Sequence, residues 1–243
     1  MFWDRWKLKR KITLLMAVLM ADGILLGTGI GMIRYRGNDN RFPQKHQTVP
    51  MAAIHPGAEE KIVALTFDDG PHETYTVQLL DGLQKRGVKA TFFLMGQNIS
   101  GNEDLVLRMQ QEGHLIGNHS YRHIPLTKAA EDMVCEAVEH TEQIIENITG
   151  NRPKYLRPPY GDWNENLECR LDLTTVFWSV DSLDWKLQNT ARIVNLVENK
   201  VRNGDIILMH DIFPESVEAA LEIIDQLTAE GYRFVTVDEL LID

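Results

Sequence analysis

The sequence predicts an α/β fold, either a small or incomplete β/α barrel or an open, doubly wound sheet. From Lys61 onward, short apolar runs alternate with segments of helical period, which is typical of parallel strands joined by right-handed crossovers. A glycine follows each predicted helix within a few residues, where a left-handed C-cap is favoured. Seven strands favour the barrel form. The predicted strands are 62–67, 90–95, 115–117, 155–156, 175–180, 206–209 and 234–237, and the predicted helices are 75–85, 104–112, 127–148, 191–201 and 215–229.

The N-terminal region has the pattern of a membrane anchor. A basic stretch, residues 1–11, precedes an apolar run at 12–33 that is 22 residues long, against roughly 20 needed to cross a bilayer. Asp22 opposes insertion by about 2.5–3.5 kcal/mol, but the Leu, Ile, Met and Val residues around it offset this cost. We expect a single-pass signal anchor in the cell membrane, with residues 1–11 cytoplasmic and the rest of the chain extracellular. The alternative is a cleaved signal peptide and a secreted protein.

The rest of the chain divides into a linker and one domain. Residues 34–60 contain three prolines and no hydrophobic period, which predicts a linker before a single domain at 61–243. The formal net charge of −10 is uneven, because residues 1–60 hold 9 basic and 5 acidic residues and residues 61–243 hold 16 and 30. So acidic a domain argues against a nucleic-acid partner, since phosphate binding needs a basic face. Nothing in the sequence predicts a protein partner.

The chain has two cysteines, Cys135 and Cys169, and they form no Cys-x-x-Cys pair. Two cysteines are too few for a disulfide framework. One disulfide is possible, but two buried, inert thiols are favoured.

Two adjacent carboxylates follow the first predicted strand, in the segment Thr-Phe-Asp-Asp-Gly-Pro at residues 66–71. Neighbouring carboxylates oppose each other's ionisation unless a cation lies close to them. A metal bound by Asp69, with Asp68 free to accept a proton, would resolve that conflict. The alternative is that both side chains cap the helix that begins near Thr74.

Two histidines follow the third predicted strand. His119 and His123 are four residues apart, so one helical turn would place both imidazoles on the same side. With one carboxylate from elsewhere, they would complete a facial set of three ligands for a divalent metal. The alternative is that both histidines lie on the surface without a functional role, which is common for histidines at this spacing.

Polar clusters also follow the fourth, fifth and sixth predicted strands. In a parallel sheet these clusters would lie at one edge together with the two described above. A fold needs no such alignment, so the five clusters together predict a functional site. The three further clusters are Arg157-Pro158-Pro159-Tyr160-Gly161, Asp181 with Asp184-Trp185, and Leu208 with His210-Asp211.

These five clusters, in order and with suitable spacing, resemble the five motifs of the polysaccharide deacetylases, the NodB-homology group or carbohydrate esterase family 4. The resemblance covers essentially all of residues 61–243. It implies a distorted (β/α) barrel with a groove for a sugar chain. It also implies one divalent metal, usually zinc although cobalt or another metal can serve, held by Asp69, His119 and His123.

The resemblance further implies removal of acetyl groups from N-acetylated sugars by a metal-bound water. Metal binding lowers the pKa of such a water from about 15.7 toward 7. The remaining roles are implied by position in the motifs: Asp68 is the general base, oriented by Arg157; the Tyr160 N–H stabilises the oxyanion; His210 is the general acid, paired with Asp184; and Trp185 and Leu208 wall the pocket for the acetyl methyl group.

An anchored, external domain of this family favours N-acetylglucosamine of peptidoglycan as substrate. The Asp-Asp first motif and the Arg-Pro-Pro-Tyr third motif resemble the glucosamine-type wall enzymes more than the muramic-acid type. Chitin oligomers, poly-N-acetylglucosamine and acetylxylan are alternative substrates. A non-catalytic glycan-binding relative would be expected to lack Asp68 or His210, and both are present. A metal-dependent phosphoesterase would need a more basic pocket than Arg157 alone provides.

Overall fold

The computed structural model describes residues 60–163 and 172–241. Eight parallel strands in this part of the chain form one sheet in the order β5-β4-β3-β2-β1-β7-β6, and β8 also pairs with β1. Along this path the described strands do not close into a ring, so the fold is a parallel half-barrel. The strands are β1 (Lys61–Asp68), β2 (Thr91–Leu94), β3 (Leu115–Asn118), β4 (Tyr155–Leu156), β5 (Thr174–Thr175), β6 (Val180–Asp181), β7 (Ile206–His210) and β8 (Tyr232–Val235).

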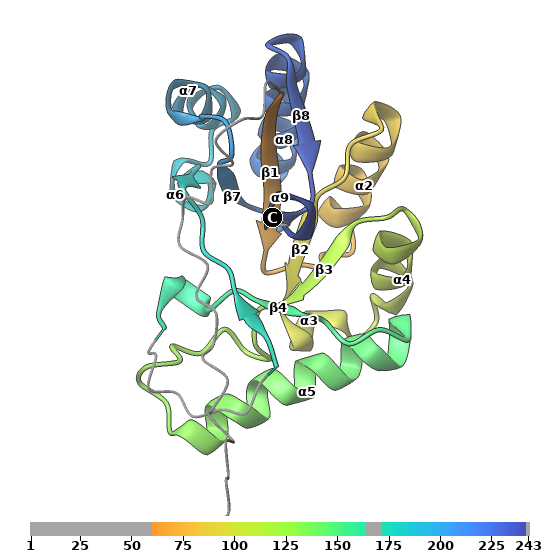
Figure 1. Ribbon diagram of the computed structural model, residues 1–243. Coiled ribbons are helices and arrows are strands. Elements are labelled where there is room, and N and C mark those ends of the chain that lie inside the picture. The colour runs from red at the N-terminus through yellow and green to blue at the C-terminus, as the bar shows by residue number, and fades with distance from the viewer. Residues whose placement is uncertain (1–59, 164–171, 242–243) are drawn as a thin grey trace, which may run out of the picture. The chain divides into compact units, whose positions relative to one another are not determined.

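Strand β1 is the centre of the sheet, as Figure 1 shows. It pairs with β2, β7 and β8, and every residue from Val63 to Asp68 is buried. An apolar run without polar alternation suits this place, because a central parallel strand is covered on both faces. In the ladder with β7, Asp68 is the partner of His210. The carboxyl ends of these two strands therefore meet at one edge.

The helices pack around this sheet. Helix α8 packs against α2 and α7, and α5 packs against α3 and α4. In Figure 1, α2 and α4 lie to one side of β1, α6 and α7 to the other, and α5 runs across one end. The helices are α2 (Tyr75–Arg86), α3 (Gly96–Ile99), α4 (Glu103–Gln111), α5 (Glu131–Thr149), the single turn η1 (Pro159–Gly161), α6 (Asp184–Leu187), α7 (Thr190–Lys200), α8 (Pro214–Ala229) and α9 (Val237–Leu241).

Most predicted elements are confirmed, but the strand predicted at 175–180 is wrong. The structure has two-residue strands at its ends, β5 and β6, and no regular strand between them. The carbonyl groups of Val176 and Phe177 accept hydrogen bonds from the Arg157 side chain, at 3.4 and 3.2 Å. These carbonyl groups therefore bind a buried cation, while the N–H groups of Val176 and Ser179 donate to Leu156 of β4 and Ile206 of β7.

Two boundaries also differ from the prediction. Helix α5 begins at Glu131 and not near residue 127, because Pro125 opens a turn whose carbonyl accepts from Lys128 and Ala129. The last strand, β8, ends at Val235 because the Thr236 side chain and the Glu239 carboxylate form hydrogen bonds that open α9.

Two features bear on the predicted location and redox state. Within the described residues, no helix is both long and apolar enough to cross a membrane; the anchor predicted at 12–33, the tail at 1–11 and residues 34–59 of the linker lie outside them.

Cys135 is disulfide-bonded, so the prediction of two inert thiols is wrong; the spacing of two cysteines does not reveal which side chains a fold brings together. Cys169 lies outside the described residues.

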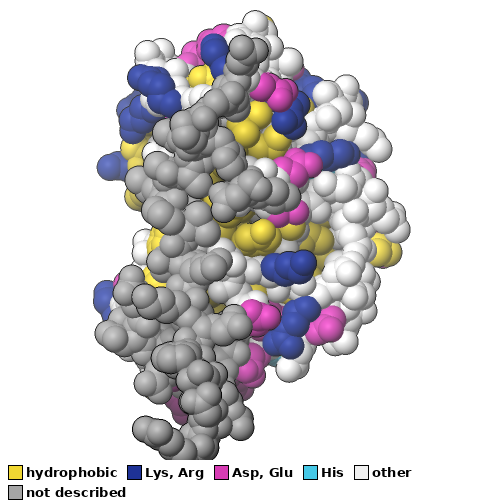
Figure 2. Space-filling model, in the orientation of Figure 1, with side chains coloured by type: hydrophobic (Ala, Val, Ile, Leu, Met, Phe, Trp, Pro, Cys, Tyr) yellow, Lys and Arg dark blue, Asp and Glu magenta, His cyan; other side chains and the backbone are white. Residues whose placement is uncertain are grey.

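The face of the molecule in Figure 2 carries Lys and Arg side chains interspersed with Asp and Glu. Charged side chains of both signs are scattered over the described part of this face, and hydrophobic side chains lie among them. A mixture of this kind is typical of a solvated surface.

Candidate active site

The first part of the site lies at the carboxyl end of β1. Asp68 is the last residue of the strand and is only 3% exposed. Asp69 follows in a left-handed conformation, with φ of 74°. Its Oδ1 atom is buried and accepts no hydrogen bond from any described residue. A buried carboxylate oxygen without a donor is unfavourable, so it indicates a ligand position.

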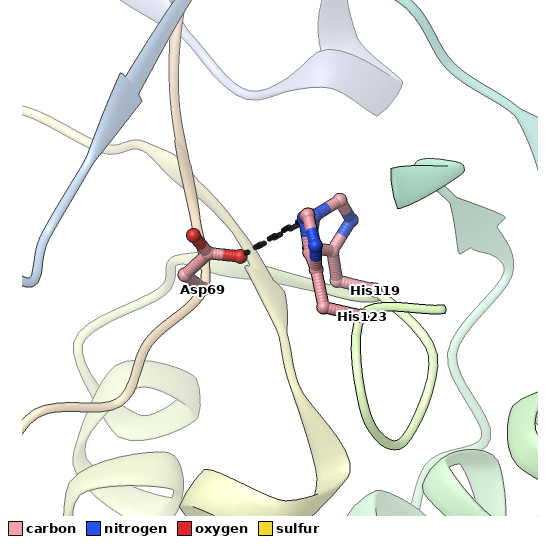
Figure 3. A group of neighbouring side chains, drawn as sticks. All are labelled: Asp69, His119 and His123. Carbon is pink, nitrogen blue, oxygen red and sulfur yellow. Dashed lines mark ion pairs between the residues drawn. The ribbon is translucent and has the colours of Figure 1, made fainter. Parts of the chain in front are cut away.

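Asp69 faces two histidines in the loop after β3 (Figure 3). Its Oδ1 atom lies 3.5 Å from Nε2 of both His119 and His123. Candidate ligand atoms of the three residues all lie within 4.8 Å of one another. The structure therefore brings together the three side chains predicted to bind metal.

A loop, and not the helical turn that the sequence suggested, brings the two histidines together. Ser120 and His123 have φ values of 63° and 53°, and the Asn118 side chain accepts a hydrogen bond from the Ser120 N–H at 2.7 Å. Asparagine side chains commonly form such a turn at the end of a strand. The imidazole rings of His119 and His123 lie 4.9 Å apart.

The surroundings of both histidines suit metal ligands. His119 Nδ1 lies 2.7 Å from the Arg157 carbonyl oxygen; since a carbonyl only accepts, Nδ1 donates to it, and Nε2 is the ring nitrogen that faces Asp69. Burial, followed by the nearby His119, lowers the pKa of His123. Two imidazoles and a carboxylate are a donor set that fits a catalytic zinc or a similar divalent transition metal.

Asp68 is held by a buried cation. Arg157 is fully buried, and its Nη1 atom donates to Asp68 Oδ1 at 2.9 Å and to Thr66 Oγ1 at 2.6 Å. The guanidinium also stacks over the Phe93 ring at 4.2 Å. Burial lowers the pKa of Arg157, against the raising effect of Asp68, but an arginine remains charged in proteins. The hydrogen bond from Arg157 therefore fixes the orientation of the Asp68 carboxylate.

His210, at the end of β7, is held in a similar way by Asp184. Its Nδ1 atom lies 2.8 Å from Asp184 Oδ1, and its backbone N–H donates to Asp184 Oδ2 at 2.7 Å. Burial lowers the pKa of His210, but the hydrogen bond and charge of Asp184, with Asp68 and Asp69, outweigh it and raise the pKa to about 9. His210 is therefore a cation at neutral pH.

The remaining predicted residues differ in exposure. Tyr160, in η1, is 67% exposed, and Trp185, in α6, is 50% exposed. The Tyr160 ring lies 4.3 Å from the His123 ring, edge to face, and its backbone has φ of 61°. Leu208 is buried. Exposed aromatic side chains at a site are typical of surfaces that contact a ligand.

Other polar residues contact the site but had no predicted role. Thr66 accepts from Arg157, and Asn98 donates through Nδ2 to the Asp69 carbonyl oxygen at 2.7 Å. Thr76 donates to Asp211, the neighbour of His210. Thr66 and Asp211 lie within the predicted motifs, so their positions in the sequence could have indicated a role at the site. Thr76 and Asn98 lie outside the motifs: Thr76 is in the helix predicted at 75–85, and Asn98 falls between the strand predicted at 90–95 and the helix predicted at 104–112.

Comparisons with known proteins agree with this geometry. The family model for polysaccharide deacetylase matches residues 55–175. The peptidoglycan-N-acetylmuramic acid deacetylase PdaC of Bacillus subtilis is 42% identical over 209 residues, which are 84% of this chain and 44% of PdaC. Its solved structure has a TM-score of 0.73 and covers 75% of this chain and 90% of that one.

Two other relatives are named for N-acetylglucosamine and not for N-acetylmuramic acid. The peptidoglycan-N-acetylglucosamine deacetylase PgdA of Listeria monocytogenes is 37% identical and covers 79% of this chain and 41% of PgdA. A peptidoglycan-N-acetylglucosamine deacetylase of Bacillus cereus is 42% identical and covers 73% of this chain and 67% of that protein. The chain thus spans less than half the length of PdaC and of PgdA.

Proposed function

The chain belongs to the polysaccharide deacetylase family, the NodB-homology group or carbohydrate esterase family 4, and on that premise we propose that it is a metal-dependent hydrolase of N-acetyl groups on N-acetylglucosamine residues of a polysaccharide. Peptidoglycan is the favoured substrate. One observation carries the proposal: a partly buried donor set for metal lies beside a carboxylate held by Arg157 and a histidine held by Asp184.

Asp69, His119 and His123 would hold the metal ion. Zinc is favoured, and cobalt or another divalent metal is the alternative. When bound, the ion supplies a Lewis acid that lowers the pKa of a coordinated water toward 7. This assignment is supported by the Asp69 Oδ1 atom, which is buried without a hydrogen bond from a described residue and lies 3.5 Å from Nε2 of both histidines.

Asp68 would act as the general base. It lies beside the donor set, with Oδ2 at 3.7 Å from His119 Nε2, but its other oxygen is occupied by Arg157. A carboxylate oriented in this way can accept a proton from the attacking water. Arg157 would thereby position the base without touching the substrate.

His210 would act as the general acid. Because Asp184 occupies Nδ1, the proton on Nε2 remains available for the leaving amine. A pKa of about 9 keeps His210 protonated at neutral pH. Protonation of the amine prevents departure of an unstable amide anion, so an acid is needed at this step.

Tyr160, Trp185 and Leu208 would bind the acetyl group. We assign the Tyr160 N–H to the developing oxyanion, since the Tyr160 ring lies 4.3 Å from that of the proposed metal ligand His123. We assign Trp185 and Leu208 to the walls around the methyl group. The buried Leu208 and half-exposed Trp185 would give this pocket an apolar base and a rim that a sugar can reach.

N-acetylmuramic acid is a second candidate sugar. It is favoured by the 42% identity to PdaC, whose name specifies muramic acid, whereas the equally identical Bacillus cereus relative is named for glucosamine. We keep glucosamine as the first candidate because of the Asp68-Asp69 and Arg157-Pro158-Pro159-Tyr160 motifs. Identity alone does not separate the two.

We further propose that residues 12–33 anchor the protein in the cell membrane with the catalytic domain outside. The basic residues before this run and its length support the proposal. An external domain would have direct access to the cell wall. Cleavage after the run would instead give a secreted enzyme.

Acetate release tests the proposal. The 243-residue chain is stripped of metal and incubated with peptidoglycan, chitin oligomers, poly-N-acetylglucosamine or acetylxylan, with and without added Zn²⁺ or Co²⁺. We expect metal-dependent acetate release from peptidoglycan, and mass spectrometry of muropeptides then identifies the deacetylated sugar. Absence of release from every polymer, by a chain that folds and binds metal, would favour a glycan-binding role.

A further inference from the structure

The turn that carries Asp69 needs support from its surroundings. Asp69 has φ of 74°, a conformation that is uncommon in non-glycine residues, although aspartate tolerates it better than most. The Asp69 side chain is correctly aimed only while this backbone is kept. The question is which residues keep it.

Support on one side comes from α3. The Asn98 Nδ2 atom donates to the Asp69 carbonyl oxygen at 2.7 Å, and the Met95 backbone N–H donates to the Gly70 carbonyl oxygen at 3.1 Å. Two successive carbonyl groups of the turn are thus bound by one short segment. Of these two hydrogen bonds, only the one from Asn98 is donated by a side chain. A substitution of Asn98 can therefore remove it without changing a backbone donor.

Support on the other side comes from Asp211 and Thr76. Asp211 is fully buried and lies against Gly70: a Cβ atom on that glycine would be 2.4 Å from both carboxylate oxygens. The Thr76 hydroxyl donates to Asp211 Oδ2 and accepts from the His72 N–H at 2.8 Å. The turn is therefore connected through α2 to the end of β7.

We propose that Asn98 and the Thr76–Asp211 pair are positioning residues that hold the turn so that Asp69 Oδ1 faces His119 and His123. This proposal rests on the proposed function, because it assumes that these three residues bind a metal. Asn98 reaches the turn through the Asp69 backbone carbonyl oxygen, and Thr76 reaches it through Asp211. Their loss should weaken metal binding, because outer contacts orient ligating carboxylates.

The first test compares Asn98→Ala with Asn102→Ala. Asn102 is a matched control, since its Nδ2 atom donates one hydrogen bond to the Asn98 carbonyl oxygen at 3.0 Å and none to the turn. The affinity of the metal-free 243-residue chain for Zn²⁺ is measured by competition with a chelator, together with the melting temperature of the metal-free protein. We expect roughly 10- to 100-fold weaker binding for Asn98→Ala and a change below about twofold for Asn102→Ala, with similar melting temperatures for both.

The second test compares Thr76→Val with Thr76→Ser. Valine keeps the shape of the buried side chain but removes the hydroxyl, whereas serine keeps the hydroxyl. We expect Thr76→Val to weaken Zn²⁺ binding roughly 10-fold or more and Thr76→Ser to stay near wild type. If Thr76→Val fails to fold, the Zn²⁺ affinity of Asn98→Ala still tests the proposal.

The outcomes separate the two proposals. Equal Zn²⁺ affinity of wild type, Asn98→Ala and Thr76→Val would overturn the positioning role and leave the deacetylase proposal intact. A wild-type chain that binds Zn²⁺ but releases no acetate would overturn the deacetylase activity, while weaker binding by the variants would still support positioning. A wild-type chain that binds no divalent metal would overturn both.

Discussion

The carboxylate of Asp184 bonds both to Nδ1 of His210 and to the backbone N–H of the same residue, at 2.8 and 2.7 Å. Asp184 is itself fully buried. Burial raises the pKa of its carboxyl group, but the His210 contacts outweigh burial and lower it. One carboxylate therefore fixes the ring orientation, the tautomer and the charge of the proposed general acid.

Removal of this carboxylate charge should move the alkaline limb of the pH–rate profile. With His210 as an acid, activity falls as pH rises through its pKa, which is about 9 in the wild-type chain. Asp184→Asn removes the main raising effect and leaves burial, which lowers the pKa, opposed by the charges of Asp68 and Asp69, which raise it. We expect the limb to move to lower pH, with activity partly recovered in acid. Profiles of kcat against pH check this, and an unmoved limb would contradict the role of His210.

The same pKa shift should appear in stability. A histidine whose folded pKa is raised stabilises the fold fully below its unfolded pKa of about 6.5, and this contribution is lost as pH rises through about 9. Relative to His210→Gln, we expect the wild-type free energy of unfolding to fall by roughly 3 kcal/mol between pH 6 and pH 10 in the metal-free protein. Urea denaturation at several pH values measures it. Parallel pH curves for the two proteins would refute the link.

Substitutions of Asp68 and Asp69 should differ in their effects on metal binding. Asp68→Asn should retain Zn²⁺ and lose roughly 10²- to 10⁴-fold in kcat, because only the base is removed. Asp69→Ala should lose metal and activity together, as should His123→Ala. Zinc content by mass spectrometry and acetate release are measured on the same samples. Retained turnover in Asp68→Asn would exclude it as the base.

Loss of the buried Arg157 should destabilise the fold. Arg157→Met leaves Asp68 as a buried charge without its partner, which costs about 3–5 kcal/mol in comparable cases. Arg157→Met combined with Asp68→Asn should recover part of this loss, since the uncompensated charge is gone. Chemical denaturation of the two single variants and the double variant gives the coupling energy. Simple additivity would show that the pair does not interact.

Removal of the metal should be reversible. Treatment with a chelator is expected to abolish acetate release, and added Zn²⁺ or Co²⁺ should restore it. Because the metal would bind to a donor set that the fold has already brought together, we expect the secondary structure measured by circular dichroism to persist in the metal-free chain. Activity that survives complete removal of metal would contradict the proposed chemistry.

The sequence predicted the parts of the site that depend on strand ends. An apolar strand followed by Asp68-Asp69, and another followed by His210, locate those side chains because parallel strands end at one edge. Asn98 was missed because its role depends on a contact with the Asp69 carbonyl, and a backbone acceptor leaves no residue signature. The strand predicted at 175–180 was wrong for a related reason, since Arg157 takes the carbonyl groups that a strand would use.

Asp68 and His210 are partners in the ladder between β1 and β7, so the backbone hydrogen bonds of the sheet set the separation between the proposed base and acid. Tyr160 stands instead on the short element η1, whereas α6 carries both Trp185 and Asp184, the carboxylate that orients His210. The turn η1 can be exchanged or lengthened without changing the ladder. Selectivity for a glycan can therefore diversify at Tyr160, while α6 has to keep Asp184 in place for the proposed acid to keep its orientation.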